Sequence, residues 1–307
     1  MITASVFSLA SCNFGNKNNR KEEVTTTETL SEPEESSSEA ETEDESIYSE
    51  GLEYVMNRDG KSYSCIGKGS CKSKKIIIPA TYNSLPVTEI GTLRVSGHAK
   101  WYGVEILIIA DGERIVNIDT FVSHQSLKEL YIGSGVTLNE RAFVFCSALE
   151  TVYISENVTI NRHAFMECNK LNSVYLSEQT VLNGTGIFYC CTNLQNVTLP
   201  PDLKILPAST FKKCSSLTNI TIPDTVTSIG HSAFASCGKL EYVFIPRTVV
   251  MIDYDILYNT YLEELNYGGT MEQWEKINKA ENWALGSSVK RIICTDGVIE
   301  LNPANSQ

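Results

Sequence analysis

The stretch "AFVFCSALETVYI" (142–154) returns ninety-one residues later as "AFASCGKLEYVFI" (233–245). Both begin with Ala-Phe, place a cysteine three residues after the phenylalanine and continue into alternating apolar positions. This phenylalanine, which we call the anchor, recurs every 22 or 23 residues, at Phe121, Phe143, Phe165, Phe188, Phe211 and Phe234, with Ile256 in the last copy. The sequence is therefore a tandem repeat, and the repeat decides the fold.

Each repeat contains the pattern L-x-x-V-x-I, which begins six residues after the anchor, from Leu127 in the first copy to Leu262 in the last. Alternating apolar residues predict a short strand with one buried face. A unit of 22 or 23 residues is too small to bury a core alone, so neighbouring units must stack. The pattern predicts an α/β leucine-rich-repeat solenoid, with parallel strands on one face and a cap at each end.

The segments outside the repeats differ from them in composition. Residues 22–50 contain twelve Asp and Glu and no Lys or Arg, which is typical of a disordered, self-repelling spacer. After the array, Met271, Trp274 and Ile277 have helical spacing, so residues 268–283 are expected to be helical. The predicted segments are a signal-like segment (1–12), an acidic Ser/Thr/Glu-rich tether (13–50), an N-terminal cap (51–91), the repeat array (92–267), and a C-terminal cap and tail (268–307).

The start of the chain suggests a lipid anchor. The sequence "LASC" (9–12) resembles a bacterial lipobox, which implies that Cys12 is the acylated residue. The segment lacks a positively charged start and a long apolar core, so either the true start lies upstream or the match is accidental. No apolar run approaches the roughly 18 residues of a spanning helix. We therefore expect membrane attachment through a lipid only, with secretion as the alternative.

The repeat itself resembles a known family. The sequence "LTNITIPDTVTSIGHSAFASCGKLEYVFIP" (217–246) resembles the BspA-like leucine-rich repeat family of cell-surface proteins. The stretches "IIIPATYNSLPVTEIG" (76–91) and "YGGTMEQWEKI" (267–277) resemble the segments that open and close such arrays. The resemblance implies a bacterial surface-attached or secreted solenoid, often implicated in adhesion to host matrix or to other cells. It implies no shared catalytic or binding residues.

Five cysteines lie three residues after an anchor. In a solenoid these thiols would point the same way, whereas a zinc site needs four converging ligands and a disulfide needs two thiols turned towards each other. A structural ladder that packs the core is therefore expected. Cys65 and Cys71 in the N-terminal cap either form a short-loop disulfide or stay unpaired. The ladder consists of Cys146, Cys168, Cys191, Cys214 and Cys237.

The sequence contains no recognisable catalytic motif. None of its four histidines belongs to a zinc-binding or nucleophile pattern, and it has no glycine-rich phosphate loop. The chain also lacks the clustered basic charge of nucleic-acid-binding proteins. We expect no enzymatic activity, no metal, no cofactor and no nucleic-acid partner.

The alternation of the strands leaves the third and fifth positions of L-x-x-V-x-I facing outward. This predicts an outer stripe of candidate ligand-binding residues, since tyrosine offers a large contact area with few rotors. Alternatively, the same aromatic ladder only stabilises the sheet. The expected function is adhesin-like binding of a protein or glycan on a host or neighbouring cell; the alternatives are a glycan-binding lipoprotein and a structural envelope component without a soluble ligand. The stripe consists of Tyr131, Tyr153, Tyr175, Tyr242 and Phe244.

Overall fold

A computed structural model describes residues 48–91 and 100–301, which belong to one compact unit. The signal-like segment with Cys12, almost all of the tether and the tail from residue 302 lie outside the described residues. The predicted lipid anchor and acidic spacer therefore stay predictions.

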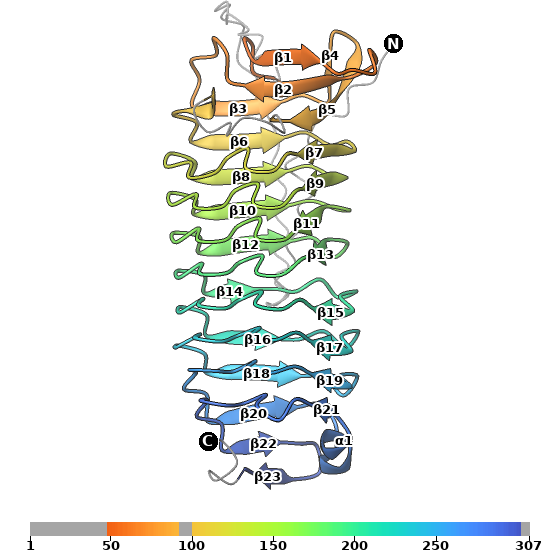
Figure 1. Ribbon diagram of the computed structural model, residues 1–307, viewed down its shortest axis with the longest axis vertical. Coiled ribbons are helices and arrows are strands. Elements are labelled where there is room, and N and C mark those ends of the chain that lie inside the picture. Colours follow the sequence, from red (N-terminus) through yellow and green to blue (C-terminus); the bar gives the residue numbers. More distant parts are fainter. Residues whose placement is uncertain (1–47, 92–99, 302–307) are drawn as a thin grey trace, which may run out of the picture. The chain divides into compact units, whose positions relative to one another are not determined.

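The described residues form an elongated solenoid with two columns of parallel strands (Figure 1). The first column carries the L-x-x-V-x-I pattern, and its strands alternate between buried and outward residues. This confirms the predicted leucine-rich-repeat solenoid. The first column contains β3 (Lys75–Ile78), β6 (Ile106–Ile109), β8 (Glu129–Ile132), β10 (Thr151–Ile154), β12 (Ser173–Leu176), β14 (Asn196–Val197), β16 (Asn219–Thr221), β18 (Tyr242–Ile245), β20 (Glu264–Tyr267) and β22 (Arg291–Ile293), with β23 (Val298–Glu300) antiparallel to β22.

A second column of shorter strands runs beside the first. Its residues follow the turn after each L-x-x-V-x-I segment, and the sequence analysis, which predicted strands on one face only, did not expect them. Most of these strands bury apolar side chains, such as Leu138 or Ile160, in the core that they share with the first column. The second column contains β5 (Leu85–Ile90), β7 (Arg114–Val116), β9 (Val136–Leu138), β11 (Thr159–Asn161), β13 (Val181–Asn183), β15 (Ile205–Leu206), β17 (Ser228–Ile229), β19 (Met251–Ile252) and β21 (Asn278–Lys279).

Different elements lie at the two ends of the solenoid. At the N-terminal end, β1 (Glu53–Met56) and β4 (Thr81–Tyr82) pair antiparallel with β2 (Tyr63–Gly67) and β5 respectively. At the C-terminal end lies α1 (Met271–Glu275), which is capped by Thr270 and buries Trp274. The expected helix is thus much shorter than 268–283, because the chain leaves it to add β21 to the second column.

The anchor phenylalanines form the centre of the core. Successive rings from Phe121 to Phe234 stack with centroid separations of 4.8 to 6.0 Å and nearly parallel planes. Trp101 lies at the N-terminal end of this stack of rings, with its ring centroid 5.1 Å from that of Phe121. The stack gives the repeats a continuous apolar axis that no single unit could bury alone.

The last repeat corrects the register that the sequence suggested. In every repeat the residues two before and two after the anchor have a left-handed backbone, and in the last repeat these are Asp255 and Asn259. The anchor is therefore Leu257, not Ile256, and the position equivalent to the ladder cysteines is Thr260, not Asn259. The alignment erred because this repeat has one residue fewer between its ladder position and Leu262.

Candidate functional site

The cysteine ladder joins each repeat to the one before it. All five ladder cysteines are buried, and each Sγ donates to the carbonyl oxygen of the preceding anchor at 3.1 to 3.2 Å. The same carbonyl oxygen also accepts a hydrogen bond from the backbone N–H three residues later in its own coil. The Phe143 oxygen, for example, accepts from the Cys146 N–H. The thiol is thus both a small apolar group and a weak hydrogen-bond donor between coils.

His124 occupies the first position of the ladder. Its Nδ1 accepts from the Leu127 backbone N–H at 3.1 Å, so the proton lies on Nε2, which donates to the Trp101 carbonyl at 2.7 Å. The imidazole therefore spans the same gap between coils as the thiols do. This role gives no indication of catalysis.

Burial also determines the chemistry of the thiols. It raises the pKa of Cys237 to about 12 and that of Cys191 higher still, so both remain protonated and poorly nucleophilic at neutral pH. Cys65 and Cys71, for which a disulfide was one of two alternatives, are free thiols in the structure. Among residues 48–91 and 100–301, no three His, Cys, Asp or Glu side chains converge as metal ligands would.

The predicted outer stripe has a regular geometry on the first column. Tyr131, Tyr153 and Tyr175 are direct neighbours on β8, β10 and β12, with ring centroids 4.6 and 4.8 Å apart and interplanar angles of 9° and 7°. The register extends this row to Ile108 on β6 and Ile77 on β3. We call these five residues the Ile/Tyr row. Ile77 was missed because it lies in the expected cap, although "IIIP" alternates in phase with the strands that follow.

Charged groups beside the Ile/Tyr row are paired. The Tyr131 hydroxyl donates to Glu129 at 2.9 Å, and burial together with this carboxylate raises the pKa of Tyr131 to about 12. Glu105, which precedes β6, accepts from Lys74 and Lys128 at 2.6 and 2.8 Å, and these hydrogen bonds lower its pKa to about 2. The side chains of the row are themselves uncharged at neutral pH, and the charged groups Glu129 and Glu105 beside it are hydrogen-bonded.

The stacking limits how the tyrosines can bind a ligand. Tyr131 and Tyr175 lie against opposite faces of the Tyr153 ring. Tyr153 consequently turns its ring edge outward, and a sugar could not stack on its face. The geometry favours edge and hydroxyl contacts with a protein.

The two remaining predicted residues form a separate group on β18. Tyr242 is 42% exposed, whereas Phe244 is half-buried and leans over Gly268, where an added Cβ would lie 2.7 Å from its ring. Between this group and Tyr175 lie β14 and β16, whose outward residues are small and polar. The structure thus places all five predicted residues on the outer face of the first column, but in two clusters.

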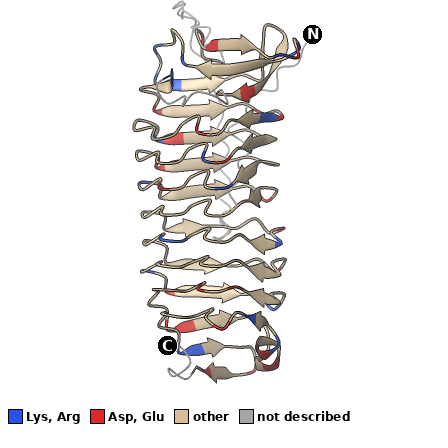
Figure 2. Ribbon diagram, in the orientation of Figure 1, with Lys and Arg blue, Asp and Glu red and all other residues tan. Residues whose placement is uncertain are grey.

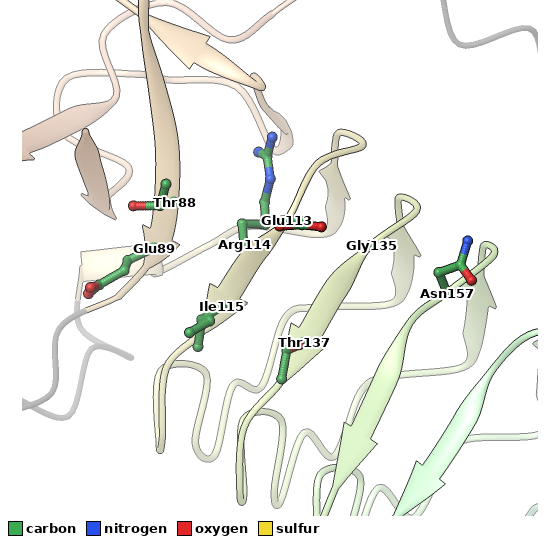
Figure 3. A pocket seen from close by; sticks show the side chains of 8 residues that line it. All are labelled: Thr88, Glu89, Glu113, Arg114, Ile115, Gly135, Thr137 and Asn157. Carbon is green, nitrogen blue, oxygen red and sulfur yellow. The ribbon is translucent and has the colours of Figure 1, made fainter. Parts of the chain in front are cut away.

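A surface depression of about 460 Å³ lies on the second column, lined by β5, β7 and β9 (Figure 3). The buried Arg114 guanidinium donates to the carbonyls of Pro79 and Asp111 at 2.8 and 2.7 Å, so it ties the first coils together. Glu89 accepts from the Asn117 amide at 3.1 Å. These contacts explain the polar lining structurally.

Asparagines beside the second column form a further ladder that sequence analysis missed. The Asn183 amide donates to Asn161 Oδ1 at 2.8 Å, and the Asn161 amide donates to the Leu138 carbonyl at 3.0 Å. The signal was present in the sequence, as Asn117, Asn139, Asn161 and Asn183 are spaced by 22 residues. The side chains of Asn117, Asn161 and Asn183 bridge neighbouring coils.

Stacked 22- and 23-residue coils, a buried phenylalanine column and a thiol ladder define a leucine-rich-repeat solenoid. The chain belongs to the family described as the BspA type leucine rich repeat region, whose profile matches six copies over residues 100–184 and 159–279. A comparison with curated proteins finds no match.

Several solved structures from bacteria are similar at low identity. A leucine rich cell surface protein from Faecalibacterium prausnitzii is 20% identical, with 75% of this chain and 96% of that chain covered and a TM-score of 0.31. The T. pallidum leucine rich repeat protein is 19% identical, with 71% and 83% covered and a TM-score of 0.38. A leucine-rich repeat protein from Bacteroides ovatus is 21% identical, with 80% and 77% covered and a TM-score of 0.42.

Proposed function

We propose that this chain is a non-enzymatic surface protein that binds a protein on a host or neighbouring cell through the outer face of its first column. The observation that supports this most directly is the Ile/Tyr row. Five in-register strands present an apolar or aromatic residue at the same outward position. Five strands at a spacing of about 4.8 Å give a row roughly 20 Å long.

The rigidity of the scaffold supports recognition. The rings are held by mutual stacking and by the backbone ladder, so they lose little conformational entropy when a partner docks. A stable protein interface buries about 800 Å² on each side, so the partner would also contact the turns beside the strands. A partner would fit this surface if it presented extended apolar side chains, together with groups that accept hydrogen bonds from tyrosine hydroxyls.

Attachment to the cell is the second part of the proposal. The lipobox-like "LASC" supports acylation at Cys12, and residues 13–50 would then separate the solenoid from the membrane. In the described part of the chain, no helix is both long enough and apolar enough to span a bilayer. Secretion without an anchor is the alternative location.

The test is a binding screen with the full chain against immobilised extracellular-matrix proteins and whole neighbouring cells. We expect a partner whose binding is lost in the triple variant Tyr131→Ala/Tyr153→Ala/Tyr175→Ala. The matched control is Thr137→Ala/Thr159→Ala, which changes outward residues of the second column. Equal binding by the triple variant and the wild type would show that the row only stabilises the sheet. Loss in the control variant would place the site on the other face.

Lipidation needs a separate measurement. Metabolic labelling with a clickable fatty acid should label the wild type and leave the Cys12→Ser variant unlabelled. Equal labelling of both forms, or of neither, would contradict an anchor at Cys12.

A further inference from the structure

Two consecutive coils of the first column present the same outward pair of side chains. Asn196 and Thr198 flank Val197 in one coil, and Asn219 and Thr221 flank Ile220 in the next. All four polar side chains are exposed, and the two coils stand next to each other (Figure 1). A repeated pair at a fixed spacing suits a ligand that is itself repetitive.

Aromatic residues border this surface on both sides. Tyr175 on β12 is 38% exposed, and Tyr242 on β18 is 42% exposed. Neighbouring coils are about one strand spacing, roughly 4.8 Å, apart, so the four coils from β12 to β18 span roughly 14 Å, although β14 and β16 belong to different hydrogen-bonded sheets. We call this the Asn/Thr surface: Ser173, Tyr175, Asn196, Thr198, Asn219, Thr221 and Tyr242.

The Asn/Thr surface carries no charge. The outward positions of β10, β12, β14, β16 and β18 include no Asp, Glu, Lys or Arg, and the arrows of β14 and β16 are uncharged in Figure 2. The next charged outward residues are Glu129 on β8 and Glu264 on β20. An uncharged ligand can therefore bind here without desolvating an unpaired charge on the protein, and no charge on this surface would favour a charged ligand instead.

Hydrogen bonds hold the two amides in a fixed relation. The Asn219 amide donates to Asn196 Oδ1 at 3.2 Å and to the Thr218 hydroxyl at 3.1 Å. A carboxamide combines donors with an acceptor, as vicinal sugar hydroxyls do, so the two can pair reciprocally. Because the amides are already oriented, less entropy is lost on binding.

From this arrangement we propose that the Asn/Thr surface binds an uncharged glycan chain that lies across the strands, along the axis of the solenoid. An extended glycan repeats its sugar rings at nearly the spacing of neighbouring strands, so one sugar would lie over each coil. Asn196 and Asn219 would bond the hydroxyls of the two central sugars, and Tyr242 would contact an outer sugar. This ligand is distinct from the protein partner of the Ile/Tyr row, and the inference does not rest on that proposed function.

The test is calorimetric titration of the full chain with cello-, malto-, manno- and chito-oligosaccharides of two to six units. We expect one series to bind with an affinity that rises up to about four units and then levels off, because the surface spans four coils. The variant Asn196→Ala/Asn219→Ala should weaken this binding about tenfold or more. Tyr242→Ala should weaken it independently.

The matched control is Asn183→Ala, an exposed asparagine on the second column with a similar amide–amide bond to Asn161. It should leave glycan binding unchanged. A failure of all four series to bind would overturn the proposal. So would binding that survives Asn196→Ala/Asn219→Ala, or that collapses between 50 and 500 mM salt as charge-driven binding does.

Discussion

The thiol ladder explains at the scale of a residue why cysteine recurs in these turns. The position needs a side chain small enough for the turn and able to donate to the carbonyl of the preceding anchor. Serine would be a stronger donor but less apolar, and alanine would donate nothing. The sequence predicted the packing role because recurrence makes the thiols parallel, which argues against a zinc site and a disulfide. It could not reveal the hydrogen bond, because alignment does not show which carbonyl a thiol reaches.

Removing one ladder thiol should destabilise the array, whereas changing its neighbour should not. We expect Cys191→Ala to lower the free energy of unfolding by about 1–3 kcal/mol, since it leaves a cavity and removes the bond to the Phe165 carbonyl. Cys190→Ala, at a half-buried thiol next to it, should change the value by less than about 0.5 kcal/mol. Urea unfolding followed by circular dichroism measures both, and equal effects would contradict a special role for the ladder.

The pKa of Tyr131 provides a second test at this scale. Its folded-state pKa of about 12 lies above the ordinary tyrosine value of about 10. The contribution of Tyr131 to stability is therefore present below pH 10 and is lost as the pH rises towards 12. In a phenolate absorbance titration, Glu129→Gln should lower the pKa of Tyr131 by removing the carboxylate, and Tyr131→Phe identifies the transition. Superimposable curves for wild type and Glu129→Gln would disprove the coupling.

At the scale of the element, the anchor turn is the most regular part of each coil. In most coils, the N–H groups of the anchor, of the residue two before it and of the residue two after it donate to the next coil, as those of Arg141, Phe143 and Phe145 do at 2.9 to 3.1 Å. The two flanking residues reach this geometry with φ near +60°. Most of them are not glycine, so the turn keeps a conformation that L-residues adopt only at a cost.

β-Branched residues should not be tolerated at these flanking positions. Phe145 has φ of 59° and is 38% exposed. We expect Phe145→Val to destabilise the protein by about 1–2 kcal/mol, because a branched Cβ clashes in the left-handed region. Phe145→Asn should be better tolerated, because asparagine adopts this conformation more readily. Thermal unfolding compares the two, with Ser147→Val as the control at an exposed turn position; a loss in Phe145→Asn as large as in Phe145→Val would refute the backbone explanation.

The elements differ in how far the sequence predicted them. First-column strands were predictable because four residues such as "TVYI" show a full alternation, whereas "SI" or "MI" in the second column is too short to show a period of two. The expected helix was too long because apolar spacing does not tell where tertiary pairing replaces a helix. The outer stripe was predicted from alternation, but its ring stacking and its division into two clusters depend on side-chain geometry that no pattern encodes.

At the scale of the whole described unit, the two columns are interrupted at the same coil. In the first column the hydrogen-bonded pairing of strands stops after β14 and starts again at β16. In the second column it stops after β13 and starts again at β15. The Thr218 N–H reaches the Gln195 carbonyl at 3.4 Å, whereas the equivalent bond from Glu150 to Lys128 is 2.8 Å. Pro200 and Pro201 in this coil have no N–H to donate. The phenylalanine stack continues through the break, with Phe188 and Phe211 5.8 Å apart.

This break should be the most easily opened part of the sheets. Because stability in a solenoid is a sum of coil and nearest-neighbour terms, a coil with fewer interstrand bonds opens locally while the rest stays folded. In hydrogen exchange followed by mass spectrometry, peptides from 195–206 should exchange faster than the equivalent 150–161. Equal protection would show that the continuous core column, and not the strand ladder, determines opening.

The same measurement connects the break with the proposed glycan surface. Asn196 and Asn219 lie on opposite sides of the interruption, so a chain that bonds both amides would add a link where the backbone ladder is missing. A bound oligosaccharide should therefore slow exchange in 195–206 more than in 150–161, because a ligand stabilises the closed state that it binds. If protection rose equally in both segments, the ligand would not bridge the break, and the two coils would have to recognise it separately or not at all.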